Sequence, residues 1–215
     1  PDRARQLAGT ADEYVGLARR LIATDEPALI LMHGFSGSGK SRVAEQLLAS
    51  LGAIRLRSDV ERKRLFDLDA GGDSGSDVGA GIYQRNASER TYEHLAEHAD
   101  AILRAGHPVI IDAAFLHQWQ RARLEDVAHR REVALRIVDC DAEADELRRR
   151  VEARRKAGSD PSEATTEVLE HQFATHDPFT SGEESQVVRC DMNGDDEAGS
   201  VQACVKRVRS SLGAA

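Results

Sequence analysis

The chain has few features of secreted, membrane-spanning or zinc-binding proteins. Its 215 residues include only three cysteines, Cys140, Cys190 and Cys204, an odd number without C-x-x-C spacing. We therefore expect neither a disulfide framework nor a zinc site, and a reducing cytoplasm fits best. No apolar run approaches the ~20 residues that a membrane-spanning helix needs, and the first residues show no signal-peptide pattern. These absences predict a cytoplasmic protein with no membrane partner.

An excess of basic charge is also missing. Lysine and arginine total 29, against 37 aspartates and glutamates, which gives a formal net charge of −8 at pH 7. A large nucleic-acid footprint needs a basic face, so this balance argues against nucleic acid as a partner. A guanine-selecting N/T-K-x-D segment is absent too, so we do not expect a GTPase switch. Hydrophobic residues make up 40% of the chain and charged residues 31%, which fits one α/β domain with a filled core.

The most informative segment that is present spans 34–41 and reads G-F-S-G-S-G-K-S. It follows the apolar run 28–32, and a buried strand that enters a glycine-rich turn and then a helix is the setting of a phosphate-binding loop. The glycines let backbone N–H groups point at an anion, and the helix dipole adds to the attraction. In this pattern Lys40 reaches the β- and γ-phosphates, and Ser41 ligates Mg²⁺. The predicted nucleotide-binding residues of this segment are Gly34, Phe35, Ser36, Gly37, Ser38, Gly39, Lys40 and Ser41.

Apolar periodicity predicts strands that alternate with helices. We expect strands at about 28–33, 53–57, 108–112, 133–138 and 185–190, and helices at about 10–24, 86–105, 118–130, 143–157, 163–175 and 197–212, with one more from the phosphate loop to Gly52. Such alternation implies a parallel sheet covered on both faces, with ligands beyond the carboxyl ends of its strands. The phosphate loop, Asp59 and Asp112 all fall at such ends, so we expect one crevice. The stretch 67–81, rich in glycine and aspartate, is predicted to be a functional or mobile loop.

Two strand-end carboxylates are candidates for the chemistry. Asp112 closes an apolar strand, as a magnesium-holding acid does; the alternative is an aspartate that only caps the next turn. Asp59 lies where a strand ends and a helix starts, so it could accept the proton of an attacking hydroxyl. Arg62 lies one helical turn further and could hold the acceptor or the transferred phosphoryl group. The alternative for Asp59 and Arg62 is an N-capping aspartate on a solvated basic helix.

The segment 147–156 is strongly basic for an acidic protein, and Arg150 and Arg154 share a helix face in it. A cationic helix of this kind suits a lid that closes over the triphosphate and neutralises developing charge. We therefore predict that both arginines bind nucleotide and that Arg154 is catalytic; the alternative is a solvated face paired with acidic neighbours. His94 and His98 match the zinc-peptidase pattern H-x-x-E-H, but without an obvious third ligand we interpret them as a polar helix surface.

The segments GFSGSGKS, RSDVERKR and VIIDAAF, with the arginine helix, make the chain resemble P-loop kinases. It is similar to the group that contains polynucleotide 5′-hydroxyl kinases, gluconate kinases, adenylylsulfate kinases and zeta-type toxins. It most resembles the ATP-binding domain that follows an aminoglycoside-phosphotransferase-like domain in many bacterial proteins. The resemblance implies a P-loop NTPase three-layer sandwich with a five-stranded parallel sheet in the order 2-3-1-4-5, a helical lid, and ATP with Mg²⁺ as cofactors. It matches Asp59 to the general base, Arg62 to its acceptor-side partner, Asp112 to the strand-end acid, and Arg150 and Arg154 to the lid arginines.

We therefore expect a single P-loop kinase domain over residues 1–215. Its parts would be a core at about 28–147 and 182–215, a lid at about 148–180, and an N-terminal helix at about 10–24. The resemblance also implies a fused N-terminal kinase-like domain that would precede Pro1. The leading function is ATP-dependent phosphorylation of a hydroxyl group on a small molecule. Two alternatives stay open: a polynucleotide 5′-hydroxyl kinase, and a nucleotide-binding regulatory module of a larger protein.

Overall fold

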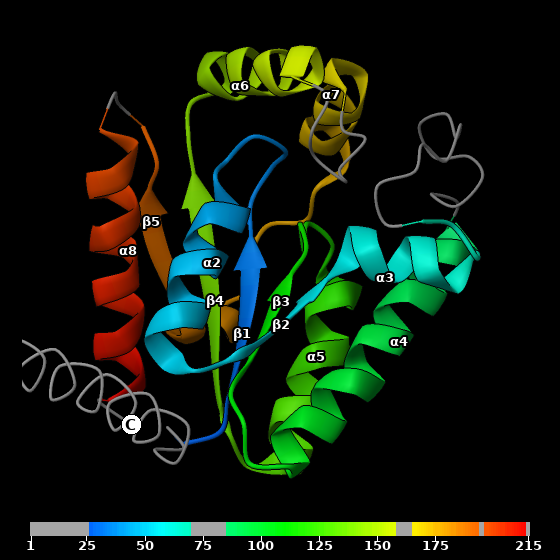
Figure 1. Cartoon of the computed structure of the whole chain (residues 1–215), viewed down its shortest axis with the longest axis vertical. Helices are drawn as coiled ribbons and strands as arrows, with labels where there is room; N and C mark the ends of the chain where they lie inside the picture. The colour runs from blue at the N-terminus through cyan, green and yellow to red at the C-terminus, as the bar shows by residue number, and fades with distance from the viewer. Residues whose placement is uncertain (1–25, 70–84, 158–164, 194–195, 214–215) are drawn as a thin grey trace, which may run out of the picture.

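The computed structural model describes residues 26–69, 85–157, 165–193 and 196–213, and it contains a five-stranded parallel sheet between layers of helices (Figure 1). The strands are β1 (Ala28–His33), β2 (Ile54–Arg57), β3 (Val109–Asp112), β4 (Ala134–Asp141) and β5 (Val187–Asp191). Their order is β2-β3-β1-β4-β5, and each neighbouring pair is parallel. The predicted α/β class and the strand order 2-3-1-4-5 are therefore confirmed.

The helices among the described residues are α2 (Lys40–Leu51), α3 (Ser58–Leu65), α4 (Arg85–Arg104), α5 (Gln118–Arg131), α6 (Ala144–Ala157), α7 (Thr166–Thr175), the short 3-10 helix η2 (Glu183–Gln186) and α8 (Glu197–Leu212). None of the helices in this part of the chain is long and apolar enough to cross a membrane. The predicted helix at 10–24 and most of the predicted loop at 67–81 lie outside the described residues.

The alternating side chains of β1 connect two packed clusters on opposite faces of the sheet. Leu29 and Leu31 pack in a cluster formed mainly with α4 and α5, whereas Ile30 and Met32 pack in a cluster formed mainly with α2 and α8. All four side chains are fully buried, which is why a central parallel strand reads as a continuous apolar run. The carboxyl ends of the strands meet beneath α6 and α7, at the top of Figure 1.

The cysteines are arranged differently from our expectation. A disulfide joins Cys190 on β5 to Cys204 on α8, with the two Cα atoms 5.3 Å apart. The prediction was wrong because the chain turns back after β5 and packs α8 against it, so two cysteines without a spacing motif come together. Cys140 is the free cysteine; burial raises the pKa of its thiol to about 12. Cysteine usage therefore gives no argument for a reducing compartment, and the cytoplasmic location stays a prediction.

Candidate active site

The phosphate loop lies between β1 and α2 and is shaped by glycines. Gly34 has a φ of 133°, and a Cβ at this position would overlap the carbonyl oxygen of Cys140 on β4. Gly37 has a φ of 87°, and a Cβ there would lie 3.0 Å from the carbonyl oxygen of Leu147 on α6. Both positions need glycine for the backbone angle and for the close approach of neighbouring backbone. α2 begins at Lys40 directly after the loop, so the motif has the predicted strand–loop–helix setting.

Lys40 folds its ammonium group back over the phosphate loop. Its Nζ donates a hydrogen bond to the carbonyl oxygen of Phe35 at 2.6 Å. Burial lowers the pKa of Lys40; the negative charges of Asp112 and Asp59 oppose this effect, and the positive charge of Arg154 adds to it. The structure therefore brings three predicted site residues, from three different elements, within electrostatic reach of this lysine.

Asp112, the last residue of β3, is buried among hydrogen-bond donors. Its Oδ2 accepts from Ser41 Oγ at 3.0 Å, and Arg55 Nη2 donates to the same oxygen. Arg57 Nε lies 3.7 Å from it, because Arg57 and Asp112 are aligned in the parallel register of β2 and β3. A hydroxyl and a carboxylate oxygen this close together fit the oxygen ligands that Mg²⁺ takes, so the metal role of Ser41 and Asp112 stays a prediction with suitable geometry. Sequence reasoning did not single out Arg55.

A second group of predicted residues lies on α3, beside α4. Asp59 is in the first turn of α3 but the N-cap position is Arg57, so the alternative of an N-capping aspartate is wrong. Arg62 is buried rather than solvated, and its Nη1 donates to Ser88 Oγ on α4 at 3.3 Å. Burial raises the pKa of Tyr92 to about 12, and the charges of Arg62 and Asp59 act on that hydroxyl in opposite directions. Arg62 lies one helical turn after Asp59, and the charges of both residues reach the Tyr92 hydroxyl.

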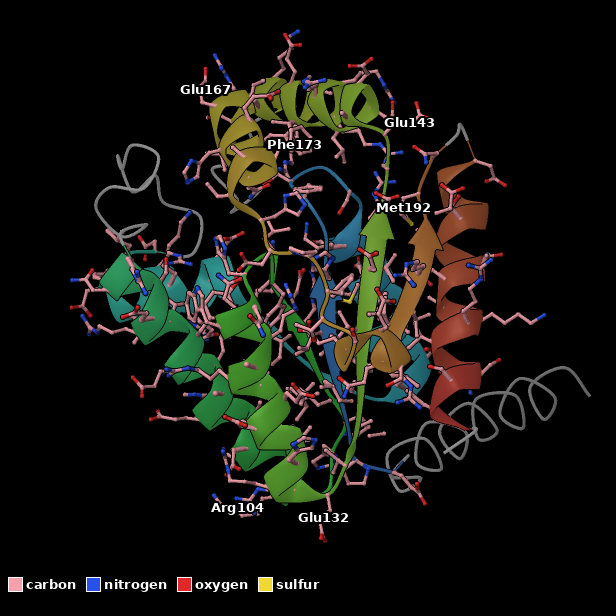
Figure 2. The ribbon with its side chains drawn as sticks, turned by 180° about the vertical axis from the view of Figure 1, so that it is seen from behind. Arg104, Glu132, Glu143, Glu167, Phe173 and Met192 are labelled. Carbon is pink, nitrogen blue, oxygen red and sulfur yellow. A yellow bond between two sulfur atoms is a disulfide. The ribbon has the colours of Figure 1, made fainter. Side chains whose placement is uncertain are left out.

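The start of the predicted lid packs directly on the phosphate loop. Leu147 and Val151 of α6 are buried in the cluster that includes α2. Arg150 Nη2 donates to the carbonyl oxygen of Met192 at 2.8 Å, and its Nη1 donates to that of Gly37 at 3.5 Å. Figure 2 labels Met192 at the end of the sheet beneath α6. In this arrangement Arg150 attaches α6 to the loop and to the segment after β5.

The other arginines of α6 are of two kinds. Arg148 pairs with Glu170 at 2.7 Å, and Arg149 pairs with Glu146 at 2.6 Å, both on the exposed side of the helix. Arg148 and Arg149 therefore match the alternative from the sequence, a solvated helix face paired with acidic neighbours. Arg154 differs, because its positive charge contributes to the lowered pKa of the loop lysine. Arg154 is also one turn after Arg150, which bonds the loop, so it lies on the phosphate-loop side of α6, and its catalytic role stays a prediction.

α7 lies over the tip of the phosphate loop, and none of its residues was among those predicted for the site. Gln172 Oε1 accepts a hydrogen bond from the backbone N–H of Ser36 at 2.9 Å. The ring of Phe35 packs edge-on against Phe173, with centroids 4.7 Å apart, and against His176 at 5.2 Å. Figure 2 shows Phe173 on α7 above the carboxyl ends of the strands. No sequence motif marks Gln172. The available sequence signal was its spacing of one helical turn from the apolar Leu169, which the structure shows to be buried.

The chain leaves α7 through a segment that one buried arginine fixes to the core. Arg121 on α5 is 1% exposed and donates to both carboxylate oxygens of Glu183, at 2.5 and 3.2 Å. It also donates to the carbonyl oxygens of Phe115 at 3.0 Å and Pro178 at 2.9 Å. Because Phe115 belongs to the loop that follows Asp112, the segment that leaves α7 is attached next to the predicted magnesium acid. Sequence reasoning did not find this arginine.

The two histidines of the zinc-peptidase pattern lie on α4, away from the phosphate loop. His94 Nε2 lies 3.3 Å from Glu61 Oε2, and the rings of His94 and His98 are 4.0 Å apart. Across the part of the chain that the structure describes, no three His, Cys, Asp or Glu side chains are grouped so that they could hold a metal ion.

Comparison with known sequences identifies the family. The model of the AAA domain family AAA_33 matches residues 29–179, well over half of the chain. The uncharacterized protein Rv2004c of Mycobacterium tuberculosis is 28% identical over 163 residues, which is 76% of this chain and 32% of that protein. The uncharacterized protein Mb2027c of Mycobacterium bovis has the same identity and coverage. The chain thus spans about a third of the length of the curated relatives it matches.

Solved structures show the same fold. A gluconokinase from Sinorhizobium meliloti matches with a TM-score of 0.62 and 18% identity, covering 87% of this chain and 94% of that chain. The APS kinase CysC of Mycobacterium tuberculosis, solved in complex with AMPPNP and APS, matches with a TM-score of 0.60 and 18% identity, covering 86% and 98%. At these identities the likeness establishes a P-loop kinase-like fold. Together with the match over residues 29–179, these findings show that the chain belongs to the AAA domain family AAA_33.

Proposed function

We propose that this chain is an ATP-dependent kinase that transfers the γ-phosphate of ATP to a hydroxyl group of a small molecule. One observation carries the proposal: Ser41 of the phosphate loop bonds Asp112 at the end of β3, Asp59 follows the neighbouring strand β2 at the same edge of the sheet, and α6, which carries Arg154, packs on the loop. Binding a nucleotide uses the lysine and a magnesium acid, whereas a further carboxylate and an arginine facing them are what phosphoryl transfer needs. The gluconokinase and the APS kinase with the same fold act on small molecules, which supports an acceptor of this size.

In the proposed reaction Asp59 takes the proton of the acceptor hydroxyl. The acceptor oxygen then forms a bond to the γ-phosphorus, while the bond from that phosphorus to the bridging oxygen of ADP breaks and ADP leaves. Lys40 and Arg154 stabilise the negative charge on the phosphoryl oxygens as it develops. Arg62, one helical turn after Asp59, and Tyr92, whose hydroxyl feels both charges, would orient the acceptor. Ser41 and Asp112 would hold Mg²⁺, which supplies charge neutralisation at the phosphates when it is bound.

A regulatory role is the second candidate, and the length of the relatives favours it. This chain covers 32% of the two mycobacterial relatives described above, so a neighbouring domain could be the part that it controls. The predicted N-terminal kinase-like domain would be such a neighbour. In this case ATP binding would matter and transfer to a free acceptor would not occur. A polynucleotide acceptor is the remaining alternative from the sequence.

Turnover of Mg·ATP against panels of possible acceptors separates these functions. The panels are sugars, aminoglycosides, nucleosides and oligonucleotides with a 5′-hydroxyl, and the control is the Asp59→Asn variant. Transfer to a small molecule by the wild type, at a rate well above the variant, supports the proposal. Transfer to oligonucleotides alone supports the polynucleotide alternative. Binding of Mg·ATP without transfer to any panel member supports the regulatory module.

A further inference from the structure

One peptide group of the phosphate loop is held from both sides. The bond between Phe35 and Ser36 is trans, so its carbonyl oxygen and its N–H point in opposite directions. The carbonyl accepts from Lys40 Nζ at 2.6 Å and from the backbone N–H of Ser38 at 3.2 Å. The N–H, which is directed away from Lys40, donates to Gln172 Oε1 on α7 at 2.9 Å. A chain of hydrogen bonds therefore runs from Gln172 through this peptide to the lysine ammonium.

Packing of α7 fixes the amide of Gln172 beside the loop. Leu169, one turn earlier, is fully buried in the cluster that includes β1 and α2. Phe173, the next residue, and His176, at the C-cap of the helix, both pack edge-on against the ring of Phe35. α7 therefore contacts the phosphate loop through two rings and one hydrogen bond, all within one turn of the helix.

We propose that Gln172 is a positioning residue of the nucleotide site, which holds the Phe35–Ser36 peptide so that its carbonyl fixes the Lys40 ammonium. The inference rests on the proposed nucleotide binding. Hydrogen bonds at the two ends of one peptide polarise it, so the amide oxygen at the N–H strengthens the carbonyl as an acceptor for the lysine. An ammonium that is already held over the loop loses less side-chain freedom when phosphates bind than a mobile one does. Gln172 thus prepares the lysine for the phosphates without touching them.

The expected effect depends on which phosphates a ligand carries. In loops of this type the lysine reaches the β- and γ-phosphates, and AMP has neither. Without the Gln172 bond, the lysine must be ordered when ADP or ATP binds, and ordering one long side chain raises the Kd by about 2- to 10-fold. AMP does not order the lysine, so its Kd should stay unchanged. Loss of the bond should therefore reduce the preference for ATP over AMP by the same factor.

Calorimetric titration with Mg·ATP, Mg·ADP and AMP tests this inference. Gln172→Met keeps the length of the side chain and removes its oxygen, so the Kd of Mg·ADP and of Mg·ATP should rise by that factor. Gln172→Ala removes side-chain packing as well and should show the same loss of preference. The matched control is Gln202→Met, at an exposed glutamine of α8, which should bind all three ligands as the wild type does. A thermal melt checks that each variant is folded.

A role through the lysine and a role in packing alone give different patterns. If the Kd of Mg·ATP rises in Gln172→Met and that of AMP does not, the inference stands. If all three Kd values rise equally, or if none changes in Gln172→Met, Gln172 only packs α7 on the loop and the inference is overturned. The proposed function is tested separately by Lys40→Ala: if the wild type binds Mg·ATP and this variant does not, the nucleotide site stands whatever the result at Gln172. If the wild type does not bind Mg·ATP, the proposed function and the inference fall together.

Discussion

Arg55 and Asp112 form an ion pair between neighbouring strands, at the same carboxylate oxygen that accepts from Ser41. Their side chains are 16% and 5% exposed, so the pair is largely shielded from water. The acid predicted to hold Mg²⁺ is thus neutralised by a cation of the protein itself. A metal ion that binds Asp112 has to share this oxygen with Arg55 or displace it.

Replacement of Arg55 by methionine should therefore lower the Mg²⁺ concentration that half-saturates nucleotide binding, by a few-fold. The methionine keeps most of the length of the side chain and removes the competing charge. Titration of Mg²⁺ at fixed ATP, read by calorimetry, measures the effect. The control is Arg64→Met, which removes an exposed arginine of α3 that pairs with Glu61. A Mg²⁺ requirement that stays the same or rises in Arg55→Met would contradict competition at Asp112.

Lys40→Ala should abolish measurable nucleotide binding without lowering the melting temperature. Burial lowers the pKa of Lys40, so the folded state disfavours its proton and the charged lysine destabilises the fold at neutral pH. Truncation removes that desolvated charge, and the melting temperature should stay level or rise. Calorimetry for binding and a thermal melt for stability check both parts. If Lys40→Ala binds nucleotide with wild-type affinity, the segment 34–41 is not the phosphate-binding loop.

The strand order and the phosphate loop could be predicted because their signals are local. A buried parallel strand is a continuous apolar run, and the loop motif is contiguous in the sequence. The unpredicted contacts, in contrast, join segments that only packing brings together: Gln172 to the loop, Arg55 to Asp112, and Cys190 to Cys204. Arg150 and Arg154 have equivalent places on a helical pattern. Only the packing of α6 against Gly37 shows that Arg150 is the one that bonds the loop carbonyl.

Asp59→Asn should reduce phosphoryl transfer to a confirmed acceptor by ~10²–10⁴-fold, the usual effect of losing a general base. The amide has the same size but cannot take the proton. Asp59 lies in the first turn of α3, where the loss of a negative charge costs only about 0.3–1 kcal/mol, so the variant should still fold. Nucleotide affinity should stay within a few-fold of wild type. Single-turnover rates and calorimetry on the same protein separate the two effects, and unchanged transfer would exclude Asp59 as the base.

Arg154→Ala should lower the maximal turnover more than it weakens ATP binding, since its charge is proposed to meet charge that grows during transfer. The neighbouring Arg155 is exposed and offers a matched control, Arg155→Ala, which should leave both quantities unchanged. Steady-state kinetics with a confirmed acceptor give kcat and KM for each variant. Equal kcat values for Arg154→Ala and Arg155→Ala would show that Arg154 has no catalytic role and would favour the alternative of a solvated helix face.

The two packed clusters on opposite faces of the sheet divide the site between them. The cluster with α2 and α8 also contains Leu147, Val151 and Leu169, which anchor α6 and α7 beside the phosphate loop. The cluster with α4 and α5 contains Tyr92, whose hydroxyl is within electrostatic reach of Asp59 and Arg62. Substitutions in separate clusters with no shared partners tend to act additively. Residues of α3 and α4 can therefore change, and with them the acceptor of the proposed transfer, without a change in the side chains that support the phosphate loop.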